Sequence, residues 1–184
     1  VACFALVTRG LGVRRSGLVG LAFGAAFMLT HLAWLRISTG TDAWIALSVV
    51  EALFYGLLGL GVPLLRRLPW WPLWLAVAWT SMETLRSGWP FSGMPWGRLS
   101  FAAIDTPAAP AVAYVGMTGL SFLLALTGFA LAHLAAELWP HVRRTTGSWD
   151  SLAVPTGGLV GIVALLVTPA VVAHDARESG TATV

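Results

Sequence analysis

Long apolar runs separated by short polar connections dominate the chain. A bilayer core about 30 Å thick needs roughly 20 apolar helical residues. Four segments meet or approach that length: Gly17–Leu35, Ala43–Leu65, Pro110–Ala136 and Thr156–Ala173. A fifth, Trp70–Arg86, is shorter, and Val1–Thr8 reads as the end of an earlier span. The pattern predicts an all-α fold, a polytopic transmembrane helical bundle of about five spans that covers residues 1–173.

Composition agrees with a membrane location. Of 184 residues, 57% are apolar and 10% are charged, whereas soluble domains are typically about 25% charged. So few charges cannot give a globule of this size a soluble surface. All 11 basic residues are arginine, and they sit in short clusters between apolar runs, which gives no indication of nucleic-acid binding. The single cysteine, Cys3, leaves no intrachain disulfide to form.

The arginines predict the orientation of the bundle. Seven of the eleven fall in alternate connections and therefore on one side of the membrane: Arg9, Arg14, Arg15, Arg66, Arg67, Arg143 and Arg144. The other side has Arg36, Arg86, Arg98 and Arg177. Because basic residues are concentrated in cytoplasmic loops, we expect the loop 87–109 and the C-terminus to face outward.

Small residues predict where helices come close. Two Gly-x-x-x-Gly pairs occur inside the predicted spans, Gly20 with Gly24 and Gly157 with Gly161. Glycines at this spacing leave a flat strip on one helical face, so that a neighbouring backbone can approach. We expect helix packing at these positions.

A charged pair ends the shortest predicted span. Glu83 and Arg86 are three residues apart, which places them on the same face of a helix. Arg86 could meet a phosphate or carboxylate in the outer headgroup layer, so that the pair positions a phospholipid. The alternative hypothesis is a simple ion pair at the helix end.

The segment WPFSGMPW, residues 89–96, is not an ordinary solvated loop. Its large apolar side chains are Trp89, Phe91, Met94 and Trp96. They are too apolar to sit together in water, and Gly93 and Pro95 favour a defined non-helical path. Irregular backbone at membrane depth requires protein or water to satisfy it. We predict a platform at the outer surface, where Arg98 adds a positive charge suited to a lipid headgroup.

Two polar residues lie inside the predicted spans. A carboxylate such as Glu51 costs about 2.5–3.5 kcal/mol at the bilayer centre, so it must face protein or water or be protonated. It is expected either near a lipid-entry cavity or in a hydrogen bond to another helix. His31 is expected to be a packing residue rather than a base. The sequence has no metal-ligand, nucleotide-binding or serine-nucleophile motif, so it predicts neither a metal site nor a cofactor.

Glu83-Thr-Leu-Arg86 followed by Gly93-Met-Pro-Trp96 resembles the signature of apolipoprotein N-acyltransferases, and Tyr114 to Leu126 resembles the next span of that family. The resemblance implies a bacterial plasma-membrane protein that uses phospholipid as acyl donor and lipoproteins as acceptors. It also implies a substrate-facing or domain-docking surface without a catalytic role. The residues of that surface are Glu83, Arg86, Trp89, Phe91, Gly93, Pro95, Trp96 and Arg98.

The same resemblance implies a nitrilase-like domain after the last span, whose Glu–Lys–Cys triad forms a thioester with an acyl chain. The triad cannot be assembled here, because the chain has no lysine and its only cysteine is Cys3. We therefore expect this chain alone to be inactive, with residues 174–184 as a linker to that domain. Two alternatives are a small transporter or channel lined by Glu51 and His31, and a non-enzymatic membrane scaffold.

Overall fold

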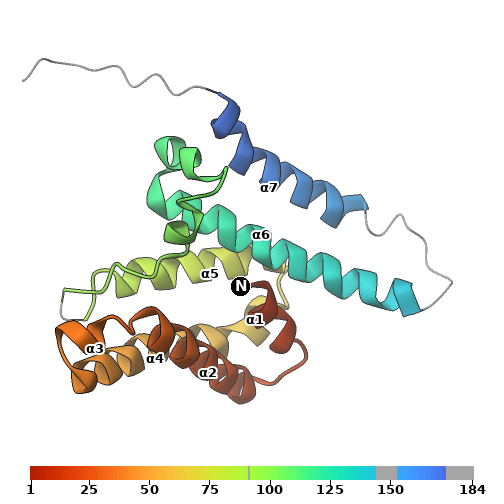
Figure 1. Cartoon of the computed structure of the whole chain (residues 1–184). Coiled ribbons are helices and arrows are strands. Elements are labelled where there is room, and N and C mark those ends of the chain that lie inside the picture. Colours follow the sequence, from red (N-terminus) through yellow and green to blue (C-terminus); the bar gives the residue numbers. More distant parts are fainter. Residues whose placement is uncertain (91, 144–152, 173–184) are drawn as a thin grey trace, which may run out of the picture.

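The computed structural model describes residues 1–90, 92–143 and 153–172. Every regular element in these ranges is a helix, which confirms the all-α fold (Figure 1). Four features of the sequence interpretation lie outside the described residues: Phe91, Arg144, Arg177 and the predicted linker 174–184.

The predicted spans correspond to five of the helices, and the predicted stub is a sixth. The α-helices are α1 (Ala2–Val7), α2 (Val13–His31), α3 (Leu35–Ser38), α4 (Thr41–Leu65), α5 (Trp71–Arg86), α6 (Val112–Arg143) and α7 (Ala153–Val171). Two 3-10 helices, η1 (Leu99–Ala103) and η2 (Ala109–Ala111), lie between α5 and α6. The first predicted span is wrong at its end, because the chain leaves the α2 helix at Leu32 and forms the short α3.

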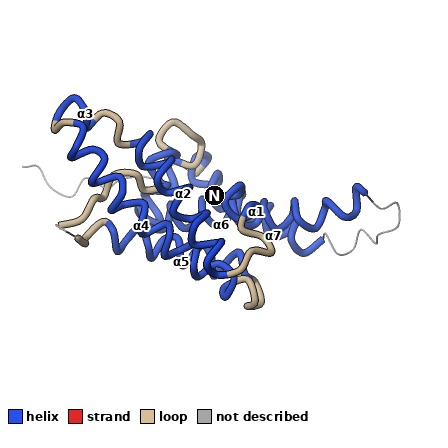
Figure 2. The backbone as a smooth tube through the Cα atoms, turned by 90° about the horizontal axis from the view of Figure 1, so that it is seen from below, coloured by secondary structure: helices blue, strands red, loops and turns tan. Residues whose placement is uncertain are grey.

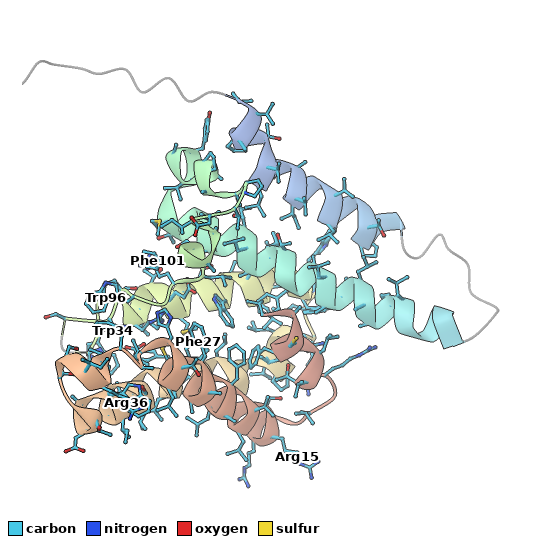
Figure 3. All side chains as sticks on the ribbon, viewed as in Figure 1. Arg15, Phe27, Trp34, Arg36, Trp96 and Phe101 are labelled. Carbon is cyan, nitrogen blue, oxygen red and sulfur yellow. The ribbon has the colours of Figure 1, made fainter. Side chains whose placement is uncertain are left out.

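The helices form one bundle in the order α2, α4, α5, α6 and α7, with α1 against α6 and α2 (Figures 1 and 2). At the loop-bearing end lie α3, the 87–98 loop and the start of α6. At the opposite, arginine-bearing end lie Arg9–Arg15 and Arg66–Arg67. Figure 3 shows this division, with Arg15 at one end and Trp34 and Trp96 at the other.

The length and apolarity needed to cross a membrane are met by fewer helices than the sequence predicted. Among the described residues, two helical stretches satisfy both criteria, Thr41–Leu65 and Ala109–Leu138, with mean hydropathies of 2.0 and 1.8. Pro155–Val171 is apolar but shorter. The expected number of about five spans is therefore not confirmed. The physical reason is that α5 has only 16 residues, while α2 has two arginines, Arg14 and Arg15, in its first turn.

A glycine-lined contact joins α2 to α4. A Cβ on Gly20 would collide with the Tyr55 carbonyl of α4, and a Cβ on Gly59 would collide with the Ser16 carbonyl of α2. The predicted close packing at Gly20 and Gly24 is therefore confirmed. Around Gly157 and Gly161 of α7, by contrast, a Cβ would meet no atom within 4 Å, so the second pair packs against no described neighbour.

The core is aromatic and centred on Trp79 of α5, which is 3% exposed. Its ring lies 5.6 Å from that of Tyr55 and 6.2 Å from those of Phe4 and Phe129. These contacts connect α5 with α1, α4 and α6. Aromatic pairs at such distances contribute beyond the area they bury, so the core holds the last turn of α5 in place below the loop.

Candidate functional site

Arg86, in the last turn of α5, organises the loop-bearing end. Its side chain is fully buried, and Nη1 donates to Glu51 Oε2 of α4 at 3.0 Å. The same nitrogen donates to the main-chain carbonyls of Met94 at 3.2 Å and Trp96 at 3.0 Å. One guanidinium therefore joins two helices and the loop. A buried arginine needs such a set of acceptors, because an unpaired charge is costly away from water.

Glu83 anchors the far side of the same loop. Its Oε1 accepts hydrogen bonds from Trp79 Nε1 and from the backbone N–H of Leu99, both at 2.9 Å. The carboxylate is 2% exposed. Leu99 begins η1, so Glu83 holds the point at which the loop resumes helical structure.

Glycines let the loop run close to α5. Gly93 has φ +77°, a left-handed conformation that side chains disfavour, and a Cβ there would collide with the backbone of Ser87. The turn is closed by Met94 N–H, which donates to the Arg86 carbonyl at 2.8 Å. Gly97, with φ +81°, is buried, and a Cβ there would lie 3.1 Å from His31 Cδ2.

A surface hollow of about 310 Å³ lies at the loop-bearing end. It is lined by His31, Trp34, Trp96, Gly97 and Phe101. Trp34 and Trp96 meet edge to face with ring centroids 5.4 Å apart, and about half of each side chain is exposed. Figure 3 shows Trp34, Trp96 and Phe101 together at this end. We call this feature the tryptophan hollow.

A second cavity adjoins the tryptophan hollow. Its volume is about 230 Å³, and it shares Gly97 with the hollow. Tyr55, Trp79 and Glu83 contribute to its wall. The Tyr55 hydroxyl and Glu83 Oε2 are buried and have no hydrogen-bond partner in the described part of the chain. The wall of this second cavity is therefore largely aromatic, and it includes two residues with a polar atom free to hydrogen-bond a bound molecule.

The remaining predicted residues do not line the tryptophan hollow. Arg98 donates from Nε to Ser87 Oγ at 3.1 Å and from Nη1 to Thr118 Oγ1 at 3.0 Å, so it connects the loop to α6. Trp89 is 62% exposed and meets Phe54 edge to face. Pro95 is exposed beside Trp96. No group of three or more metal-ligating side chains occurs among the described residues.

The charged residues pair differently from the spacing-based hypothesis. Arg86 forms its ion pair with Glu51 and not with Glu83, and it is buried instead of reaching the headgroup layer. Glu51 therefore makes a bond to another helix, one of its two predicted roles. His31 stacks on Phe27 at 5.5 Å and lines the tryptophan hollow, whereas Glu51 does not line it. The structure thus gives no support to a path lined jointly by Glu51 and His31.

Sequence reasoning missed the contributions of Trp34, Gly97 and Phe101 to the hollow, and it missed the link between Glu51 and Arg86. The link had a usable signal. Opposite charges within different apolar spans are expected to pair with each other. Trp34 gave no such signal, since it lies more than 60 positions before Trp96 in sequence.

Comparison with known sequences identifies the family. The family model described as "Apolipoprotein N-acyltransferase N-terminal domain" matches residues 1–130. This chain belongs to the apolipoprotein N-acyltransferase family. The apolipoprotein N-acyltransferase of Mycolicibacterium smegmatis is 36% identical over 165 residues, which cover 88% of this chain and 27% of the relative. That of Photobacterium profundum is 29% identical over 132 residues, covering 65% of this chain and 25% of the relative.

The part of this chain that matches the apolipoprotein N-acyltransferase family model includes every residue that lines the tryptophan hollow. It also includes Glu83 and Arg86, which hold the loop. The chain spans about a quarter of the length of the curated relatives it matches. No solved structure matches it.

Proposed function

We propose that this chain forms the membrane part of an apolipoprotein N-acyltransferase. The complete enzyme would move a fatty acyl chain from a membrane phospholipid to the N-terminal diacylglyceryl-cysteine of a lipoprotein. Family membership supports this reaction, and the apolar character of α4 and α6 supports a membrane location.

The proposal rests mainly on one observation: the backbone of Trp96 is held in place while its side chain lines the tryptophan hollow. Arg86 holds the loop by the carbonyls of Met94 and Trp96, which leaves the Trp96 ring free to face outward, 51% exposed. Amphipathic indole rings favour the membrane interface. A hollow lined by Trp34, Trp96 and Phe101 is suited to contact an acyl chain as it moves from the bilayer towards the catalytic group.

The chemical step would belong to groups outside this chain. In thioester-based acyl transfer, a cysteine thiolate attacks the ester carbonyl and donors stabilise the oxyanion. The acceptor amine then displaces the thiolate and forms the amide. Within this chain, Glu83, Arg86, Trp89, Gly93, Pro95, Trp96 and Arg98 would instead position lipid or dock a catalytic domain. We accordingly propose that the chain alone does not transfer acyl groups.

The loop-bearing end would face out of the cell and the arginine-bearing end would face the cytoplasm, in a bacterial plasma membrane. The distribution of Arg9, Arg14, Arg15, Arg66 and Arg67 supports this orientation, because basic residues concentrate in cytoplasmic loops. A reaction on lipoproteins at the outer surface requires the tryptophan hollow on that side.

A test compares two tryptophans in a protein that also carries the catalytic domain. Trp96→Ala should lower acyl transfer from phospholipid to a diacylglyceryl-cysteine peptide roughly tenfold, since full burial of a large apolar side chain contributes about 1.5–3 kcal/mol. Trp74→Ala is the control, because Trp74 is 42% exposed on α5 and does not line the hollow. If both variants were as active as the unsubstituted protein, the hollow would have no role in acyl transfer.

A further inference from the structure

A second apolar recess lies towards the arginine-bearing end, away from the tryptophan hollow. It has a volume of about 410 Å³ and lies between the start of α5, the second half of α6 and the first half of α7. Trp71, Leu126, His133, Gly158 and Leu159 are among its lining residues. We call it the α5–α6–α7 groove. Almost all of its lining is apolar, so its contents must be apolar over most of their length.

Trp71 connects this groove to a group of arginines. The Arg66 guanidinium carbon lies 4.4 Å from the centre of the Trp71 ring, and the same side chain meets His133 edge to face with ring centroids 5.5 Å apart. Arg67 follows in sequence and is exposed. Arg9 donates from Nη1 to the Ala136 carbonyl at 3.3 Å, one turn beyond His133 on α6. We call Arg9, Arg66 and Arg67 the arginine cluster.

Within the described part of the chain, no acidic side chain forms an ion pair with the arginine cluster. The ion pair formed by described residues is that of Arg86 with Glu51, which lies near the middle of α4, 15 residues before Arg66. Arg66 bonds the Ala5 carbonyl, yet its Nε is buried without a hydrogen-bond partner among the described residues. Burial lowers the pKa of Arg66, and the positive charge of Arg9 lowers it further. A nearby anion would offset both effects.

We propose that the α5–α6–α7 groove and the arginine cluster together form a binding site for an anionic phospholipid. An acyl chain would lie in the groove, and the phosphate would lie at the arginine cluster. Guanidinium groups match phosphate oxygens through paired N–H donors. Basic pockets between membrane helices are a recurrent way of holding anionic headgroups.

The size and chemistry of the groove favour a lipid over a partner helix. A volume of about 410 Å³ falls in the range of small-ligand sites, about 300–1,000 Å³. A helix with side chains is about 10–12 Å across and would need a wider groove. A lipid at this site would connect α7 to α5 and α6, since the groove takes lining residues from all three helices. This role does not depend on acyl transfer, which would take place at the other end.

Direct binding tests the proposal. The protein, purified in a non-ionic detergent, is titrated with phosphatidylglycerol, with phosphatidylcholine of the same acyl chains, and with inorganic phosphate, and bound lipid is counted by native mass spectrometry. Phosphatidylglycerol should bind at least about fivefold more tightly than phosphatidylcholine, the difference expected for one arginine near a headgroup. Equal binding of the two lipids overturns the role of charge. Inorganic phosphate that binds as tightly as phosphatidylglycerol overturns the role of the acyl chain.

Arginine variants locate the headgroup. Arg66→Gln and Arg67→Gln should each weaken phosphatidylglycerol binding about fivefold. Arg67 is exposed, so its variant keeps the test valid should the Arg66 variant fold poorly. Arg36→Gln is the matched control, because Arg36 also stacks on a tryptophan, Trp44, at 5.2 Å, but at the loop-bearing end. An equal loss in the Arg36 variant, or no loss in the Arg67 variant, overturns the assignment.

Glycine variants locate the acyl chain. Gly158 lines the groove and neighbouring Gly157 does not, and a Cβ on either would meet no atom within 4 Å. Gly158→Leu should therefore fold normally and weaken phosphatidylglycerol binding about tenfold, equivalent to two displaced methylene groups. Gly157→Leu should leave binding unchanged. Unchanged binding in the Gly158 variant places the lipid elsewhere and overturns the proposal.

Discussion

Arg86 of α5 and Glu51 of α4, 35 positions apart in sequence, form a fully buried ion pair with Nη1 and Oε2 3.0 Å apart. The pair connects the two helices directly below the loop. Because Nη1 also bonds two loop carbonyls, a change at Glu51 alters the support of a segment that Glu51 does not contact. The first prediction follows from this arrangement.

Glu51→Ala should lower the free energy of unfolding by about 3–5 kcal/mol, because it leaves the Arg86 charge buried without its partner. The measurement is reversible unfolding in mixed detergent, with Trp fluorescence as the signal. Asp42→Ala is the control, since Asp42 is an exposed carboxylate on the same helix whose favourable position at the N-terminus contributes about 0.3–1 kcal/mol.

The double variant Glu51→Leu/Arg86→Met should be more stable than Glu51→Ala alone, because an apolar pair of similar volume leaves no buried charge. It should nevertheless lose the loop structure, since the carbonyls of Met94 and Trp96 lose their donor. Protease accessibility of the 87–98 loop reports this loss. A loop equally protected in the double variant would show that Arg86 is dispensable for its path.

Gly93→Ala should destabilise the protein more than Gly10→Ala. The two glycines have nearly the same positive φ, +77° and +74°, but a Cβ on Gly93 would strike the Ser87 backbone, whereas Gly10 has nothing within 4 Å. Gly10→Ala should cost about 1–2 kcal/mol from the left-handed conformation alone. Gly93→Ala should cost a further ~1–3 kcal/mol from the collision. Equal costs would mean that the loop does not run against α5.

Two glycines on α4 separate helix packing from helix propensity. Gly59→Ala should destabilise the α2–α4 contact by about 1–3 kcal/mol, because the new methyl group meets the Ser16 carbonyl. Gly61→Ala should be neutral or stabilise by up to ~1 kcal/mol, since its Cβ would meet only Leu65 Cδ1 at 4.0 Å. Unfolding of both variants under the same conditions gives the comparison.

Orientation can be measured with single cysteines in a Cys3→Ser background. Ile37→Cys places a thiol at the loop-bearing end, where Ile37 is 94% exposed. Gly12→Cys places one at the other end, in an open position that leaves every arginine intact. An impermeant thiol reagent added to intact spheroplasts should modify Ile37→Cys only. Modification of Gly12→Cys alone would reverse the proposed orientation.

The helices could be predicted from the sequence because burial in lipid and in protein both demand long apolar runs. The break after His31 could not, since Leu32 and Leu35 are apolar and buried, and only the chain direction changes there. The number of membrane-spanning helices could not be predicted from the sequence either. Hydropathy alone does not distinguish an apolar helix that packs within a bundle from one that crosses a membrane.

The candidate site was predictable as a set of residues but not as a set of contacts. Glu83 and Arg86 do lie on one helical face, yet each bonds elsewhere, Glu83 to Leu99 and Arg86 to Glu51. Spacing along a helix identifies possible neighbours, but the choice among acceptors depends on where the loop and α4 come to rest. Trp96 was recognised from its motif, whereas its partner Trp34 comes from the distant α2–α3 turn.

Arg86 holds the loop through hydrogen bonds to main-chain carbonyl oxygens, which every amino acid has. Residues 94 and 96 can therefore be exchanged without removing the acceptors that hold the segment in place. The path of the loop is therefore set by its backbone, and a substitution at position 96 would change the surface of the hollow while leaving the hydrogen bonds that support the loop in place.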